Sequence, residues 1–144
     1  MPMNDISDAL GTLMFQICRA HRNRAQDLLS SLGLYSGQEI LLMHLWEKDG
    51  RTQSELAQLM CIRPPTLTKS IDRMSHAGLV ERRADMADGR VSRIFLTAAG
   101  RNLRVGVEAA WQQVEAESFA NLIPEDRILL RRLLMQVNQG IGPG

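Results

Sequence analysis

Apolar residues recur every three or four positions near the start of the chain, from Asp5 to about Ser31. This apolar stripe is made by Ile6, Leu10, Leu13, Met14 and Ile17. The spacing predicts one face of a long helix. Continued at 100° per residue, the same face meets His21 and Arg24 before it returns to Leu28. We interpret these two groups as partners of a carboxylate across a helix interface. The alternative is a site for a small anionic effector, since Arg holds a carboxylate with two hydrogen bonds.

A second predicted helix follows Gly33 and is apolar on nearly every side over Ile40–Trp46. Ser36 and Glu39 have the spacing of a capping box, so Ser36 is the expected N-cap. The apolar character predicts a buried helix. His44 lies within it and is expected to be a satisfied core residue, because no other His, Cys or carboxylate stands beside it at metal-ligand spacing.

Two short helices joined by a tight turn come next. Thr52 and Glu55 form another capping-box pattern. The buried face of the helix that they open is expected from Leu56, Leu59 and Met60. Cys61–Arg63 is too short for anything but a sharp reorientation. Pro64–Pro65 fits only the first turn of a following helix, which should extend to about His76.

This fourth helix has two contrasting faces. One face carries Leu67, Ile71 and Met74, and the opposite face carries Pro65, Thr66, Lys69 and Arg73. A short basic helix supported from behind by a partner helix matches what the DNA major groove admits. The alternative is an ordinary solvated surface.

A predicted hairpin follows, with strands over Leu79–Arg83 and Val91–Thr97. Asp88-Gly89 between them is a strong hairpin signal, because Gly tolerates the positive φ that such turns require. The hairpin carries Arg82, Arg83, Arg90 and Arg93. An arginine near the tip could enter the minor groove, and Asp88 could orient Arg90 with a salt bridge. The alternative for these arginines is simple solubility.

The last part of the chain predicts two further helices, one from a Thr97 cap to about Asn121 and one from Pro124. Their apolar stripes are Leu103, Val107, Ala110 and Val114 in the first, and Leu130, Leu133, Leu134 and Val137 in the second. Together with the first helix they hold more apolar surface than a small winged-helix core can cover. We therefore expect a dimerisation layer, although packing within one subunit could absorb part of that surface.

Charge is concentrated in the middle of the 144-residue chain, whose formal net charge is only +1. Arg51–Arg104 holds ten Lys and Arg against five Asp and Glu. The first fifty residues hold four against six, and the last forty hold three against five. A basic helix-turn-helix and hairpin form the electrostatic footprint expected of a protein that approaches a polyanion.

Other classes of protein are disfavoured. Met1–Leu13 carries Asp5 and Asp8 without a basic leader, so we expect no signal peptide, and no apolar run is long enough to predict a membrane span. Cys18 and Cys61 form no C-x-x-C pair, which argues against structural zinc or disulfides and favours the cytoplasm. No Ser, His and Asp set and no glycine-rich phosphate loop indicate an enzyme, and neither a cofactor nor a metal is expected.

The chain resembles the MarR family of bacterial and archaeal regulators along nearly its whole length. The matching positions are Leu56-Ala57, Ile62, Thr66-Leu67-Thr68-Lys69, Ile71-Asp72-Arg73-Met74, Gly78-Leu79-Val80, Asp88-x-Arg90, Leu96-Thr97 and Gly100. The resemblance implies a homodimer that places the fourth helix in the major groove and the wing in the minor groove. It differs at Arg63, Pro64 and Pro65, where the family often has small polar residues, and at Gly89, where an arginine is common.

The expected fold is therefore mainly α with a small β-hairpin wing, in a single domain over 1–144. Within it, 36–97 form a winged helix-turn-helix lobe and 5–31 and 98–139 form dimerisation helices. The candidate DNA-binding residues are Arg63, Pro65, Thr66, Thr68, Lys69, Arg73, Arg82, Asp88, Arg90 and Arg93.

The expected function is a transcription regulator, a repressor of a neighbouring operon, that binds double-stranded DNA at an inverted repeat. Many family members respond to aromatic carboxylates, phenols or acyl-coenzyme A compounds, and the resemblance places such an effector near His21, Arg24, His44 and Trp46. Two alternatives stay open: a redox-responsive regulator acting through Cys18 or Cys61, and a winged helix that binds protein only. The effector, the operator and the target genes are not determined by the sequence.

Overall fold

The computed structural model describes residues 5–142, so Met1–Asn4, the start of the stretch predicted to lack a leader, lies outside it. The elements in chain order are η1 (Ile6–Asp8), α1 (Leu10–Ser30), α2 (Gln38–Glu47), β1 (Arg51–Thr52), α3 (Gln53–Met60), α4 (Pro64–His76), β2 (Val80–Ala84), β3 (Ser92–Leu96), α5 (Ala98–Asn102), α6 (Arg104–Ser118) and α7 (Pro124–Ile141). The fold is mainly α with a small β-hairpin wing, which confirms the predicted fold class.

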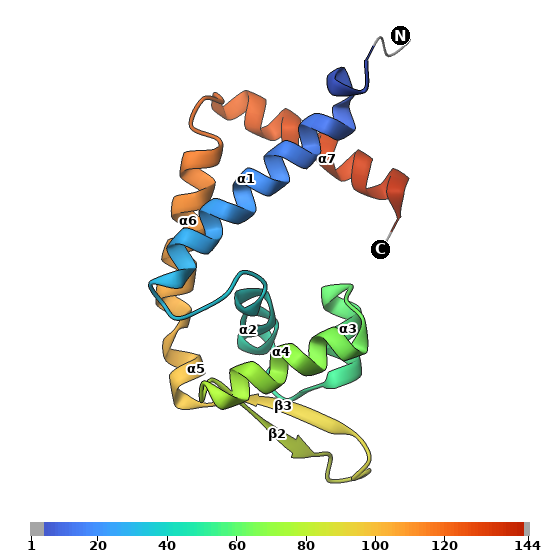
Figure 1. The fold of residues 1–144 in the computed structure, drawn as a ribbon, viewed down its shortest axis with the longest axis vertical. Coiled ribbons are helices and arrows are strands. Elements are labelled where there is room, and N and C mark those ends of the chain that lie inside the picture. Colours follow the sequence, from blue (N-terminus) through green and yellow to red (C-terminus); the bar gives the residue numbers. More distant parts are fainter. Residues whose placement is uncertain (1–4, 143–144) are drawn as a thin grey trace.

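Long helices form one end of the molecule and a smaller lobe forms the other (Figure 1). α1 runs beside α6, and their contact buries Ala25 and Leu29 against Val107, Ala110 and Val114. The lobe gathers α2, α3, α4 and the strands. Its core includes the fully buried Leu41, Leu42, Leu45, Leu56, Leu67, Ile71, Met74 and Ile94. One continuous apolar cluster thus joins the long helices to the lobe.

Within the described residues, the strands form one three-stranded antiparallel sheet in the order β1-β3-β2. The hairpin register runs from Val80 opposite Leu96 to Ala84 opposite Ser92. The predicted hairpin is confirmed: the first strand has the predicted length but starts one residue later, and the second is one residue shorter at each end. The predicted reason for the turn was wrong, because Gly89 does not adopt a positive φ. The sequence missed β1, which has only two residues and gains its partner from β3 more than forty positions later. A strand this short has no alternation that a pattern could reveal.

The start of α2 differs from the prediction. Gly37, not Ser36, is the N-cap, with a φ of 103° that favours glycine. The Gln38 carboxamide accepts from the Tyr35 N–H, and the Glu39 carboxylate accepts from the Gly37 N–H at 2.8 Å. The predicted Ser36 cap was therefore wrong. The side chains of Gln38 and Glu39, in the first turn, accept hydrogen bonds from backbone N–H groups that precede the helix instead.

Two other helices depart from their expected burial or length. Leu59 of α3 was expected inside but is 46% exposed. Met43, in the helix expected to be buried all round, is 45% exposed. The expected single helix after Thr97 breaks at Leu103, whose N–H donates to the Arg101 carbonyl, and so becomes α5 and α6.

The apolar stripe of α7 faces solvent in the isolated chain. Leu133, Leu134 and Val137 are each nearly half exposed, and no described residue of α7 is fully buried. The first half of α1 is similar, with Leu10, Leu13 and Ile17 all exposed. The predicted surplus of apolar surface is confirmed for α1 and α7, whereas the stripe of α6 is covered within the chain.

Candidate nucleic-acid interface

The helix-turn-helix is built from local signals that the sequence carries. Thr52 caps α3, since its hydroxyl accepts from the Glu55 N–H at 3.1 Å. Cys61 ends α3 in the left-handed conformation with φ 52°, which reverses the chain toward α4. Pro64 and Pro65 occupy the first turn of α4, where no intrahelical N–H is needed. These predictions are confirmed.

α4 presents a polar face that is supported by a buried one. Leu67, Ile71 and Met74 are all 0% exposed, so the helix cannot rotate without losing its core contacts. The exposed face carries Arg63, Pro65, Thr66, Lys69 and Arg73. The buried face thus holds the exposed polar face of α4 in one orientation toward solvent.

Thr68 is half-buried and serves the packing of the two helices. Its hydroxyl donates to the Pro64 carbonyl at 3.0 Å and accepts from the Gln53 amide at 2.6 Å. The bond from Gln53 joins the first turn of α3 to α4, whereas the bond to Pro64 lies within α4 itself. Thr68 therefore lies beside the exposed face rather than on it, and the sequence did not single out Gln53.

The wing is held in shape by Asp85, another residue that the sequence reading missed. Its carboxylate accepts from the backbone N–H groups of Ala87 and Asp88 and pairs with Arg93. Arg93 also donates to the Gly50 carbonyl at 2.9 Å, so it fastens the hairpin to the loop before β1. The Arg93 guanidinium and these hydrogen bonds hold the pKa of Asp85 below its ordinary value. Arg93, predicted to bind DNA, is thus already occupied within the protein.

Arg90 lies near the wing tip and is almost fully exposed. Its side chain is 92% exposed, and its Nε lies 3.2 Å from Asp88 Oδ1. The same carboxylate oxygen accepts from the Arg90 N–H, which fixes the turn. The predicted Asp88–Arg90 pair is therefore present, and it leaves the Arg90 side chain almost fully in solvent.

Arg82 and Arg83 point to opposite faces of β2. Arg82 pairs with Asp72 of α4 at 2.7 Å, whereas Arg83 pairs with Glu81 and lies over the Phe95 ring, 4.4 Å from its centroid. Alternation along a strand explains the separation. Of the four hairpin arginines, Arg90 has its guanidinium most fully in solvent.

The four candidate effector residues lie in two separate groups. Arg24 forms a two-bond pair with Glu117 of α6, with distances of 2.6 and 2.9 Å, which confirms the predicted carboxylate partner. This pair and Gln113 lower the pKa of Glu117 to about 2. His21 was predicted to share this carboxylate but instead lies against Trp111, with ring centroids 5.7 Å apart, so that part of the prediction was wrong. His44 and Trp46 form the second group, on α2. Trp46 donates to the Gly100 carbonyl at 3.1 Å, on the side of α2 that faces α5, and the His44 carbonyl accepts from Arg51 Nε at 3.0 Å.

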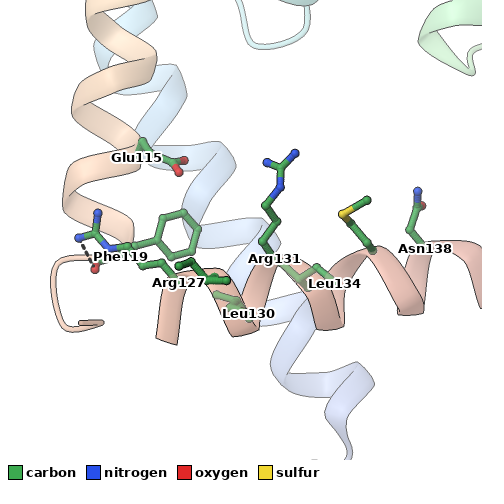
Figure 2. A pocket seen from close by; sticks show the side chains of 9 residues that line it. Glu115, Phe119, Arg127, Leu130, Arg131, Leu134 and Asn138 are labelled. Carbon is green, nitrogen blue, oxygen red and sulfur yellow. Dashed lines mark hydrogen bonds between the residues drawn. The ribbon is translucent and has the colours of Figure 1, made fainter. Parts of the chain in front are cut away.

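A cavity of about 600 Å³ opens elsewhere, between the end of α6 and α7. Figure 2 shows Phe119, Leu130 and Leu134 at its base and Arg131 projecting above α7. Arg127 is turned aside, because it donates to the Phe119 carbonyl at 2.8 Å. None of the four candidate effector residues lines this cavity.

The described residues offer little for other kinds of site. Among residues 5–142, no three His, Cys, Asp or Glu side chains gather as a metal ion would require. The helices of the same part of the chain are too short or too polar to cross a membrane. Cys18 and Cys61 are both exposed free thiols.

A basic helix backed by a buried partner helix, beside a hairpin with an exposed arginine at its tip, defines a winged helix-turn-helix protein. The MarR family model matches residues 34–92 of the chain. The HTH-type transcriptional repressor Rv2887 of Mycobacterium tuberculosis is 29% identical over 125 residues, which cover 87% of this chain and 90% of that protein. The chain belongs to the MarR family.

Solved structures agree with this assignment. A probable transcriptional regulator from Pseudomonas aeruginosa is 26% identical, with a TM-score of 0.85 over 93% of this chain and 100% of the other. A mutant MarR from E. coli, complexed with operator DNA, shares the fold at 24% identity and TM-score 0.82, over 93% and 99% of the two chains. CouR from Rhodococcus jostii, bound to p-coumaroyl-CoA, shares the fold at 22% identity with a TM-score of 0.79, over 93% of this chain and 94% of CouR.

The protein is accordingly a MarR-family transcription regulator that binds DNA. Members of this family are transcription regulators rather than enzymes, which agrees with the prediction from the sequence.

Proposed function

We propose that the protein is a cytoplasmic homodimeric repressor that binds an inverted-repeat operator and is released by a small anionic effector. The observation that carries the proposal is the exposed face of α4 over a fully buried one. Residues 36–97 act as the DNA-binding lobe, and residues 5–31 and 98–139 act as the dimerisation helices.

The proposed DNA contacts divide between the two grooves. Thr66, Lys69 and Arg73 reach base edges and phosphates in the major groove, with Arg63 and Pro65 at the start of the helix. Arg90 enters the minor groove, where negative potential attracts a guanidinium. Asp88 orients Arg90, while Thr68, Arg82 and Arg93 support the surface through their contacts inside the protein.

Dimerisation is supported by the apolar surface that the single chain leaves uncovered. The exposed apolar side chains gather on the first half of α1 and along α7: Leu10, Leu13, Met14, Ile17, Ile128, Leu129, Leu133, Leu134 and Val137. The cavity in Figure 2 is continuous with the α7 part of this surface. A monomer rarely exposes so many apolar residues together. A second copy would cover them and would place two α4 helices about 34 Å apart, one helical turn of DNA.

Effector control is supported by the site around Trp111. Its indole Nε1 is buried without an acceptor among the described residues, and His21 and the Arg24–Glu117 pair lie on the same helix pair. An aromatic or acyl carboxylate could accept from Trp111 and compete with Glu117 for Arg24. Such a ligand would release the operator only through a preference for a dimer shape that does not fit DNA.

The test is a footprint on the DNA upstream of the protein's own gene, with the variant Lys69→Ala/Arg73→Ala. A good base contact is worth about 1–3 kcal/mol, and two contacts are lost from each of two subunits, so we expect binding to fall at least a hundredfold. Lys48→Ala/Arg104→Ala removes the same charge from exposed positions outside α4 and the wing and should retain the footprint. An unchanged footprint with the α4 variant would refute the assignment of α4 as the reading helix.

The two alternatives from the sequence have their own tests. Operator binding that responds to peroxide in the wild type, but not in Cys18→Ser/Cys61→Ser, would support a redox regulator. No shift of any DNA at low salt would favour a protein-interaction module instead. Release by one member of a panel of aromatic carboxylates and their coenzyme A thioesters would establish effector control.

A further inference from the structure

One ion pair joins the recognition helix to the wing. Arg82 lies on the same face of β2 as the buried Val80, so its side chain runs toward α4. Its Nη1 lies 2.7 Å from Asp72 Oδ1, and its Nη2 donates to the Thr68 carbonyl at 3.4 Å. Among residues 5–142, Arg82 is the one side chain of β2 or β3 that forms a hydrogen bond or an ion pair with α4.

The contact between Arg82 and α4 lies next to the residues that we propose to read DNA. Thr68 and Asp72 are four residues apart and therefore lie along one stripe of the helix. Lys69 and Arg73, each one position later, form the adjacent exposed stripe. Arg82 thus contacts α4 beside its proposed DNA-reading face. Arg82 itself lies on β2, a strand of the hairpin that also carries Arg90.

We propose that Arg82 is a positioning residue that fixes α4 and the wing relative to each other, so that both grooves can be engaged at once. This inference rests on the proposed operator recognition by α4 and Arg90. The Arg82 side chain is about two-thirds covered, and its guanidinium already contacts the Asp72 carboxylate and the Thr68 carbonyl, which leaves less of it for phosphate.

A direct phosphate contact by Arg82 would give a different pattern of mutant effects. In that case Asp72→Ala would free the guanidinium and remove a repulsion, so operator binding would tighten. If Arg82 positions α4, both Arg82→Ala and Asp72→Ala weaken binding. The double variant is then no weaker than the worse single variant, because both changes break one contact.

The experiment measures operator and non-specific DNA affinity of the full-length protein for these three variants across a range of salt concentrations. Two partly exposed pairs per dimer allow a loss of about two- to thirtyfold in operator affinity. We expect non-specific affinity and the salt slope to stay unchanged. A lost phosphate contact would instead lower the slope by about 0.9 for each phosphate. Arg83→Ala is the matched control, since it removes the same charge from the other face of β2.

Charge exchange provides a rescue test that a general loss of stability would not pass. Arg82→Asp alone should weaken operator binding, and adding Asp72→Arg should recover most of the loss, because the pair is restored with its charges reversed. Tighter binding by Asp72→Ala, additive losses in the double variant, or no rescue would each overturn the proposal. The variant Lys69→Ala/Arg73→Ala, measured in parallel, separates the positioning role of Arg82 from operator reading by α4. If this variant binds the operator normally, operator reading by α4 itself is wrong.

Discussion

We expect the substitution Gly100→Ala, which adds a single methyl group, to destabilise the folded protein strongly. A Cβ on this residue of α5 would lie closer than 3.0 Å to the carbonyl oxygen of Leu79 and 3.2 Å from Leu96 Cδ2. The Leu79 carbonyl is backbone at the base of the wing, and it accepts from the Thr97 N–H at 3.1 Å. The Gly100 carbonyl itself accepts from Trp46. Gly100→Ala therefore forces apart segments that backbone hydrogen bonds hold together.

The expected cost follows from three contributions. Overpacking a tight contact costs about 1–3 kcal/mol, and each of the two weakened hydrogen bonds contributes about 0.5–1.5 kcal/mol. Alanine gains about 1 kcal/mol over glycine in helix propensity. The free energy of unfolding should thus fall by roughly 3 kcal/mol. Operator binding should weaken as well, because the displaced Leu79 leads directly into β2.

Urea denaturation at one fixed protein concentration would measure this loss, since a dimer's stability depends on concentration. Gly106→Ala in α6 is the matched control. Its Cβ would meet only Leu32 Cδ2 at 2.9 Å, the far end of a flexible side chain that can turn away. We expect Gly106→Ala to change stability by less than about 1 kcal/mol. A Gly100→Ala protein as stable as the wild type would refute the reasoning.

Two further predictions concern single contacts. Thr52→Ala removes the hydroxyl that accepts from the Glu55 N–H and should lower the free energy of unfolding by about 1 kcal/mol in urea denaturation, whereas the exposed neighbour Ser54→Ala should be near neutral. The pKa of Glu117 falls from 4.5 to about 2 because Arg24 bonds its ionised form. A depressed pKa in the folded state adds stability that is complete above about pH 4.5 and is lost as the pH falls toward 2. The stability difference between wild type and Glu117→Gln should shrink across that window, and a constant difference would contradict it.

Much of the fold and of the proposed DNA-reading face follows from local patterns. The apolar period of α4, its two prolines and the Thr52 cap depend on residues within a few positions of one another, so the sequence determines them. The same holds for the Asp88–Arg90 pair. The exposed residues Lys69, Arg73 and Arg90 could all be predicted for this reason.

Tertiary structure decided which of the other candidate residues are available. Arg82, Arg93 and Arg90 look alike in sequence, but Arg82 holds Asp72 and Arg93 holds Asp85 and Gly50, while Arg90 stays in solvent. These partners lie on other elements or across a turn, so the spacing of residues in the sequence does not predict them.

The same limit applies to burial and to pairing across the chain. Arg24 finds Glu117 ninety-three positions away, and β1 exists only because β3 returns beside it. Helical and turn preferences act over a few residues, so the sequence by itself determined the elements and their polar faces. Which charges are neutralised, and which apolar stripes still need a partner, depends on packing between distant segments, and only the folded chain brings those segments together.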